Sequence, residues 1–185
     1  VYMELAKRAL TLGKKILVLV PEIGLAPQIA ERFSKSLGFE VPLIHSALSA
    51  PIKRKSWLSI LSGRATIVIG TRSAILSPFE YDLVILDEEH DSSYKQEDSA
   101  PHYHARTLAF HEAAKWGGLV LLGSATPSVE TFWAAKSRKL HYLVLSHRAT
   151  EVELPKVSIV DMKKKWRKQD SSLLLSSELR EALTK

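Results

Sequence analysis

Short, nearly wholly apolar runs alternate along this chain with segments of helical length, and this alternation limits the folds that it can adopt. The runs are rich in β-branched residues, so both faces of each strand must be buried. Buried strands separated by helices predict an α/β domain with a mainly parallel sheet flanked by helices. The expected strands are residues 16–20, 41–44, 66–69, 83–86, 119–122 and 142–145, and the expected helices are residues 25–37, 50–61, 103–115 and 127–135, after a first helix that Gly13 ends.

The character of the sequence changes after about residue 147. Residues 1–147 are expected to form the α/β domain, and residues 148–185 a connector that leaves it. The connector contains an expected strand at 157–160, a basic run at 163–168 and a helix at 178–183 capped by Ser176 or Ser177. Both ends of the chain fall inside helical patterns, so we expect it to be part of a longer protein.

Composition excludes several classes of protein. The chain has no cysteine, which excludes disulfide frameworks and thiolate metal sites and suits a reducing cytosol. No apolar run reaches the roughly 18 to 20 residues of a membrane span. The net charge is +6, although residues 79–98 contain eight acids and a single base, Lys95. A basic body with one acidic spot suits a protein that binds a phosphate backbone and a divalent cation, but uneven surface charge would explain it equally well.

Acidic side chains directly follow the expected strand at residues 83–86. They belong to the run Asp87, Glu88, Glu89 and His90, at the strand end where α/β sheets bind ligands. One carboxylate there can hold Mg²⁺, and the next can orient a water that attacks a phosphate. A strand that ends in solvated acids is the structural alternative.

Small and hydroxyl residues follow the strand at residues 119–122. Gly123 permits close backbone approach, and Ser124 or Thr126 can cap the next helix or bond a neighbouring loop. Two further strand ends, at residues 18–22 and 69–74, carry small, hydroxyl or cationic residues that suit the phosphates of a nucleic-acid strand. Ordinary strand-to-helix turns would explain each of these ends alone.

Taken together, the four strand ends resemble motifs Ia, Ib, II and III of superfamily 2 helicases, in that order. DEEH at residues 87–90 resembles the Walker B box, and GSATPS at 123–128 resembles motif III. The match narrows to the PriA family of replication-restart helicases, because four segments resemble that family: LVPEIGLAPQ (19–28), GTRSAIL (70–76), DEEHDSSYKQE (87–97) and YHAR (103–106). The resemblance covers nearly the whole chain.

The resemblance implies a RecA-like lobe of a P-loop NTPase, from a cytoplasmic 3′-to-5′ DNA helicase that uses ATP and Mg²⁺ in replication restart. Asp87 would serve Mg²⁺, and Glu88 would polarise the hydrolytic water. Glu89 and His90 would link the nucleotide state to the DNA-facing loops, with Ser124 and Thr126 as their partners.

The resemblance also implies partners: single-stranded and forked DNA, other primosome proteins and single-stranded DNA-binding protein, and no membrane. The residues expected to contact DNA are Thr71, Arg72, Tyr94, Lys95, Tyr103 and Arg106.

A P-loop is absent from the 185 residues. The motif requires G-x-x-x-x-G-K-[ST], but Gly13-Lys14 is followed by Lys15 and preceded by Arg8 where the first glycine belongs. By resemblance the chain begins just after the P-loop, so its sheet is expected to lack the P-loop strand. The second motor lobe and the family's cysteine-rich zinc insertion are expected outside this chain. We therefore predict that the isolated chain has no ATPase activity.

Two other readings of the sequence stay open. The chain could be a lobe of a different superfamily 2 DNA translocase, against which the LVPEIGLAPQ and YHAR segments argue. It could also be a non-enzymatic DNA-binding or adaptor domain that kept the fold, in which case the complete DEEH run would have no role.

Overall fold

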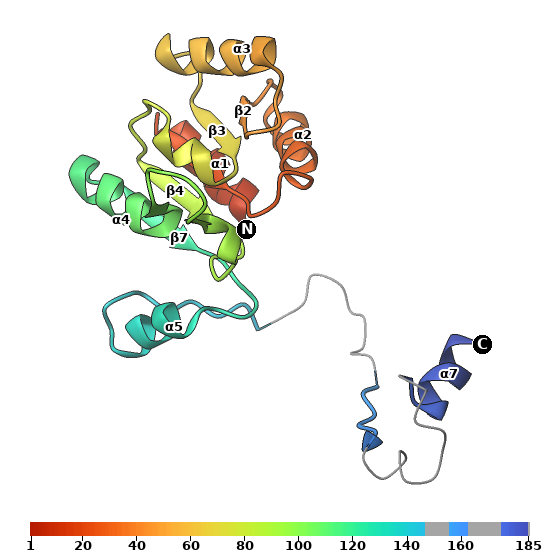
Figure 1. Ribbon diagram of the computed structural model, residues 1–185. Helices are drawn as coiled ribbons and strands as arrows, with labels where there is room; N and C mark the ends of the chain where they lie inside the picture. Colours follow the sequence, from red (N-terminus) through yellow and green to blue (C-terminus); the bar gives the residue numbers. More distant parts are fainter. Residues whose placement is uncertain (147–155, 163–174, 185) are drawn as a thin grey trace. The chain divides into compact units, whose positions relative to one another are not determined.

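Five parallel strands form the central sheet (Figure 1). The computed structural model describes residues 1–146, 156–162 and 175–184. Across the sheet the strands lie in the order β2 (Leu43–Ile44), β3 (Ile67–Gly70), β1 (Ile16–Leu19), β4 (Leu83–Leu86) and β7 (Leu119–Leu122). These strands confirm the parallel sheet and five of the strands that the apolar runs predict.

The strands end together at one edge of the sheet. Leu19, the last residue of β1, is in register with Gly70 of β3 and Leu86 of β4, and Leu86 is in register with Leu122 of β7. Because the strands are parallel, the turns that follow them emerge side by side. This register brings together segments that are far apart in the sequence.

Alternate residues of each strand pack into two separate cores. In β1, Ile16 and Val18 belong to one core, and Leu17 and Leu19 belong to the other. Apolar residues of α1 (Tyr2–Thr11) and α2 (Ala26–Leu37) complete the first core. Residues of α3 (Ala50–Leu61), the 3₁₀ helix η1 (Arg72–Leu76) and α4 (Ala105–Trp116) complete the second. Burial on both faces explains why β1, β3 and β4 lack polar residues, whereas β7, at the edge of the sheet, is only partly buried.

A short hairpin stands between β4 and α4. It follows the 3₁₀ helix η2 (Ser92–Tyr94) and consists of the antiparallel strands β5 (Lys95–Gln96) and β6 (Tyr103–His104). The predicted helix at 103–115 therefore begins two residues later, at Ala105. The reason is local: His104 is extended and caps the helix, since its Nδ1 accepts a hydrogen bond from the Arg106 amide.

Two predicted strands are wrong. Residues 142–145 and 157–160 form no strand in the described part of the chain, and the side chains of Leu143 and Leu145 are 83% and 77% exposed. An apolar run becomes a strand only where a neighbouring strand accepts its backbone hydrogen bonds. No described strand lies against either run.

The chain divides into two compact units, Val1–Tyr142 and Leu143–Lys185. The first contains the sheet and also α5 (Val129–Lys136). In the second, α7 (Ser177–Leu183) is capped by Ser176, whose Oγ accepts a hydrogen bond from the Leu179 amide, as the sequence predicts. The basic run at 163–168 lies outside the described residues. Of the helices described, none has the length and apolar character to cross a membrane.

Gly70 lies where a side chain would collide with the backbone of the neighbouring strand. A Cβ atom there would lie 2.4 Å from the Ile44 carbonyl oxygen and 2.5 Å from the Ala74 Cβ. We therefore expect Gly70→Ala to lower the free energy of unfolding by about 1–3 kcal/mol, measured by urea denaturation with circular dichroism. Gly24→Ala is the matched control, because its added methyl meets nothing within 4 Å. Equal stability of the two variants would contradict the expected collision.

Candidate functional site

The residues that follow β4 form a tight turn held on both sides. The Asp87 amide donates to the Leu19 carbonyl at 3.0 Å, and the Glu89 amide donates to the Gly123 carbonyl at 3.0 Å. Between them Glu88 adopts a left-handed conformation with φ of 46°, which is uncommon for a residue with a Cβ atom. After this turn the Glu88 and His90 side chains remain close together, with Glu88 Oε2 3.6 Å from His90 Nδ1.

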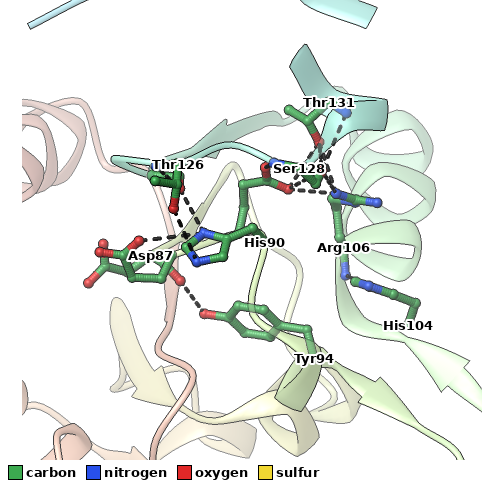
Figure 2. A network of polar contacts seen from close by, with 11 residues as sticks. Asp87, His90, Tyr94, His104, Arg106, Thr126, Ser128 and Thr131 are labelled. Atoms are coloured by element: carbon green, nitrogen blue, oxygen red, sulfur yellow. Dashed lines mark hydrogen bonds and ion pairs between the residues drawn. The ribbon is translucent and has the colours of Figure 1, made fainter. Parts of the chain in front are cut away.

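Asp87 is held by two tyrosine hydroxyls. Tyr2, in the first turn of α1, donates to Asp87 Oδ1 at 2.9 Å. Tyr94 donates to the backbone carbonyls of Asp87 at 2.6 Å and Leu19 at 3.0 Å, and Figure 2 shows its hydroxyl aimed at the Asp87 backbone. Burial, with the hydrogen bond to Asp87 and the charges of Asp87 and Glu88, raises the pKa of Tyr2. Burial is also the main reason that the pKa of Tyr94 is raised.

His90 bridges the turn after β4 and the turn after β7. Its Nδ1 lies 2.7 Å from Ser124 Oγ, and its Nε2 lies 3.4 Å from Thr126 Oγ1. The Ser124 hydroxyl also accepts a hydrogen bond from the Thr126 amide at 2.9 Å. Figure 2 shows the His90 ring beside Asp87, with Thr126 above it. His90 thus contacts the two hydroxyl residues that the sequence analysis assigns to it.

Glu89 has other partners than expected. Its side chain is 1% exposed and does not bond Ser124 or Thr126. Glu89 Oε1 accepts the Ser128 amide at 2.7 Å. Glu89 Oε2 accepts Arg106 Nη1 at 2.5 Å and Thr131 Oγ1 at 3.0 Å. The prediction for Glu89 is corrected, because its side chain bonds Ser128 and Thr131 at the start of α5.

Arg106 completes this buried network. Its Nη1 also donates to Ser128 Oγ at 2.8 Å and to Thr131 Oγ1 at 2.9 Å. Ser128 is the N-cap of α5 and accepts the Thr131 amide. Burial opposes the ionisation of Glu89, but hydrogen bonds from the Ser128 amide, Arg106 and Thr131, with the charge of Arg106, lower its pKa overall. The network ties the end of β4 to the beginnings of α4 and α5.

The structure contradicts two of the expected DNA contacts. Tyr94 is 0% exposed, so its ring cannot stack on a base. Arg106 directs its guanidinium to Glu89, not outward. Both residues are drawn inward because they satisfy polar groups at the end of β4 that burial would otherwise leave unpaired.

The other four expected DNA contacts differ in accessibility. Thr71 is buried, with 7% of its surface exposed. The guanidinium of Arg72 donates hydrogen bonds to the backbone carbonyls of Ser93 and Lys95 and so supports the hairpin. Lys95 is exposed and forms an ion pair with Glu97. Lys95 and Tyr103 line a hollow of about 430 Å³ on the hairpin, together with Gln96, Glu97, His102 and His104.

Sequence reasoning missed the polar roles of several residues. In the sequence, Tyr2 occupies an apolar position of the first helix, and Asp87 lies 85 positions further along the chain. The sequence analysis assigns no role to Ser128 or Thr131, although a serine that precedes a helix is a recognisable N-cap signal. No local signal identifies the inward orientation of Tyr94.

The donor set at Asp87 fits a magnesium ion that is mostly bound by water and phosphate. Mg²⁺ usually takes one or two protein carboxylates and completes its shell with water and substrate phosphates. Asp87 offers one half-buried carboxylate, and the described residues contain no group of three metal-binding side chains. Asp87 is therefore suited to a metal ion whose shell is completed by water or by the phosphates of a nucleotide, and not to a protein-only metal cage.

A family model and several known proteins match this chain. The family model described as DEAD/DEAH box helicase matches residues 2–132. The chain is 45% identical over 189 residues to the replication restart protein PriA of Synechocystis sp. (strain ATCC 27184 / PCC 6803 / Kazusa), covering 99% of the chain and 22% of that relative. It is 41% identical over 184 residues to the replication restart protein PriA of Bacillus subtilis (strain 168), covering 99% of the chain and 23% of that relative.

The chain thus spans less than a quarter of the length of these relatives. Among solved structures it is similar to the Pyrococcus furiosus Hef helicase domain, with a TM-score of 0.45 and 18% identity, covering 70% of this chain and 28% of that one.

Proposed function

Because this chain belongs to the DEAD/DEAH box helicase family, we propose that it forms most of the first, RecA-like motor lobe of an ATP-dependent DNA helicase that moves 3′ to 5′ in replication restart. The parallel sheet with helices on both faces and the carboxylates after β4 agree with such a lobe. Identities of 37–45% to replication restart proteins over nearly the whole chain support the assignment to that process.

The chemical role of the turn after β4 follows from its donors. Asp87 would hold the Mg²⁺ of a bound nucleotide, and Glu88 would orient the water that attacks the γ-phosphate. A bound Mg²⁺ supplies positive charge beside the phosphates. Both acids are partly exposed, so water and a ligand can reach them.

The main support for the proposal is that two neighbouring residues of the turn after β4 both contact the segment after β7. His90 contacts Ser124 and Thr126, and the adjacent Glu89 holds Ser128 and Thr131 at the start of α5. A shift of the acidic turn on ATP hydrolysis would therefore move the segment after β7. Through Arg106, the same shift would reach α4 and the hairpin that precedes it. Coupling of this kind is what a motor lobe requires, whereas an adaptor domain has no need of it.

The charge of the chain favours a nucleic acid as its partner. The net charge is +6 although eight acids lie between residues 79 and 98, so the rest of the sequence is strongly basic. Lys95 and Tyr103 on the β5–β6 hairpin are the accessible candidates for a phosphate and a base contact. We further propose that the whole protein acts in the cytoplasm on single-stranded and forked DNA, with other primosome proteins and single-stranded DNA-binding protein, and that any zinc site lies outside these residues.

The 185-residue chain alone is expected to hydrolyse no ATP above the buffer rate, with or without DNA. Its sequence contains no P-loop, so the amides and lysine that cradle the triphosphate are missing. A longer protein that adds a P-loop and a second motor lobe is expected to show DNA-stimulated hydrolysis in the same phosphate-release assay.

Comparing forked with single-stranded DNA in that assay distinguishes a replication-restart helicase from a general superfamily 2 translocase. Stronger stimulation by forked DNA than by plain single-stranded DNA supports replication restart. Equal stimulation points to a general superfamily 2 translocase, and turnover by the 185-residue chain alone would refute the predicted need for the P-loop.

A further inference from the structure

The hydroxyl of Tyr2 contacts the carboxylate that would serve Mg²⁺. It reaches Asp87 Oδ1 from the first turn of α1, at 2.9 Å and in a partly buried position. Tyr94 holds the backbone of the same residue through the Asp87 carbonyl at 2.6 Å. Asp87 therefore has one tyrosine on its side chain and another on its main chain. The two contacts come from elements on opposite sides of Asp87 in the sequence.

The space for the Tyr2 hydroxyl exists because residue 123 is glycine. A Cβ atom on Gly123 would lie 1.7 Å from the Tyr2 hydroxyl oxygen and 2.8 Å from Cζ of the ring. Gly123 is also fixed in place, because its amide donates to the Leu86 carbonyl at 2.9 Å and its carbonyl accepts from the Glu89 amide at 3.0 Å. The hydroxyl thus lies in a notch formed by three segments: α1, the turn after β4 and the turn after β7.

We propose that Tyr2 is a positioning residue that orients the Asp87 carboxylate for a divalent cation. This inference rests on the proposed function, which assigns that cation to Asp87. A phenol is protonated at neutral pH and donates one hydrogen bond, while a carboxylate accepts at both of its oxygens. Tyr2 fixes Oδ1 and leaves Oδ2 for the metal. Hydrogen bonds from outer partners of this kind hold a metal-binding side chain in its productive orientation.

A purely structural role for Tyr2 makes a different prediction. The Tyr2 ring packs beside the core that α1 and α2 share with the sheet, and phenylalanine would keep that packing. Tyr2→Phe removes the hydroxyl alone. It should leave the fold unchanged and should weaken cation binding only if the hydroxyl orients Asp87.

The test uses Mn²⁺ as a paramagnetic probe on the ¹⁵N-labelled 185-residue chain. Mn²⁺ should broaden the amide signals next to Asp87 in a saturable way. Tyr2→Phe is expected to raise the apparent dissociation constant by about tenfold, and Asp87→Asn should abolish the local broadening. Tyr142→Phe is the control, because that ring packs on Phe132 and should leave Mn²⁺ binding unchanged.

A second substitution and a second spectroscopic signal test the positioning role without relying on Tyr2→Phe and Mn²⁺ binding alone. Gly123→Ala places a methyl where the hydroxyl lies and should weaken Mn²⁺ binding in the same direction. The ¹³Cγ signal of Asp87, recorded without metal, should move in Tyr2→Phe and stay in place in Tyr142→Phe.

The outcomes separate this inference from the proposed function. If Tyr2→Phe binds Mn²⁺ like the wild type while Asp87→Asn does not, the positioning role is overturned and the metal assignment stands. If Asp87→Asn binds Mn²⁺ like the wild type, the metal assignment fails and the positioning role fails with it. Loss of the fold in Tyr2→Phe would make the hydroxyl a structural element and overturn the positioning role.

Discussion

Replacing Arg106 by methionine is expected to lower the free energy of unfolding of the chain by about 3–5 kcal/mol. Glu89 is 1% exposed and depends on Arg106 for its only opposite charge among the described contacts. Methionine keeps much of the packing of the arginine stem but leaves a buried carboxylate without a counter-ion. Urea denaturation followed by circular dichroism measures the loss as a shift of the midpoint.

Arg8→Met is the matched control for this substitution. Arg8 also pairs with a glutamate, Glu4, but the two side chains are 77% and 63% exposed. Exposed pairs of this kind contribute about 0.5 kcal/mol or less. Similar midpoints for the two variants would show that the Arg106–Glu89 pair does not hold the site together.

The same pair gives the chain a predictable sensitivity to acid. The pKa of Glu89 is lowered in the folded chain, whereas a glutamate in an unfolded chain has a pKa of about 4.3. The stabilisation is therefore complete above that pH and is lost as the pH falls from there towards the folded pKa. Glu89→Gln should make stability less dependent on pH in this range, which denaturation at a series of acidic pH values would detect.

Replacing Glu88 by glutamine is expected to reduce DNA-stimulated ATP hydrolysis by about 10²- to 10⁴-fold in a helicase that carries this segment together with a P-loop and a second lobe. Glutamine has nearly the same shape, so the left-handed backbone at this position, with φ of 46°, is equally strained in both. What is lost is the carboxylate that orients the attacking water. Phosphate release measures the rate, and fluorescence anisotropy with labelled DNA checks that binding persists.

Glu40→Gln controls for the loss of a glutamate charge elsewhere on the lobe. Glu40 pairs with Lys55 on the surface, where the side chains are 76% and 69% exposed, and its substitution should leave the rate unchanged. Undiminished hydrolysis in Glu88→Gln would remove Glu88 from catalysis and favour the adaptor alternative.

Local patterns were sufficient for the architecture. Strands such as residues 83–86 must be buried on both faces, and a sheet with that property is parallel and covered by helices. Once the strands are parallel, their C-terminal ends meet at one edge. The proximity of the acidic turn at residues 87–90 to Ser124 and Thr126 was therefore predictable without coordinates. The two failures, residues 142–145 and 157–160, are runs with strand composition but no described partner strand.

The choice of partner at the site was decided only by tertiary packing. Four hydroxyl residues follow β7 closely: Ser124, Thr126, Ser128 and Thr131. Their order in the sequence does not indicate which of them Glu89 will bond. The left-handed Glu88 sends Glu89 inward to Ser128, Thr131 and Arg106, while His90 remains at the surface with the first two hydroxyls.

Buried polar groups select their partners by position in space and not by distance along the chain, because each must find a donor or acceptor where it is cut off from water. For that reason the contacts of Tyr2 and Tyr94 with Asp87 could be found only in the folded molecule. The parallel sheet and its acidic edge depend on hydrophobic periodicity, which is a property of the sequence. The hydrogen bonds that orient the acids depend on three-dimensional coincidences among α1, β4, α4 and α5.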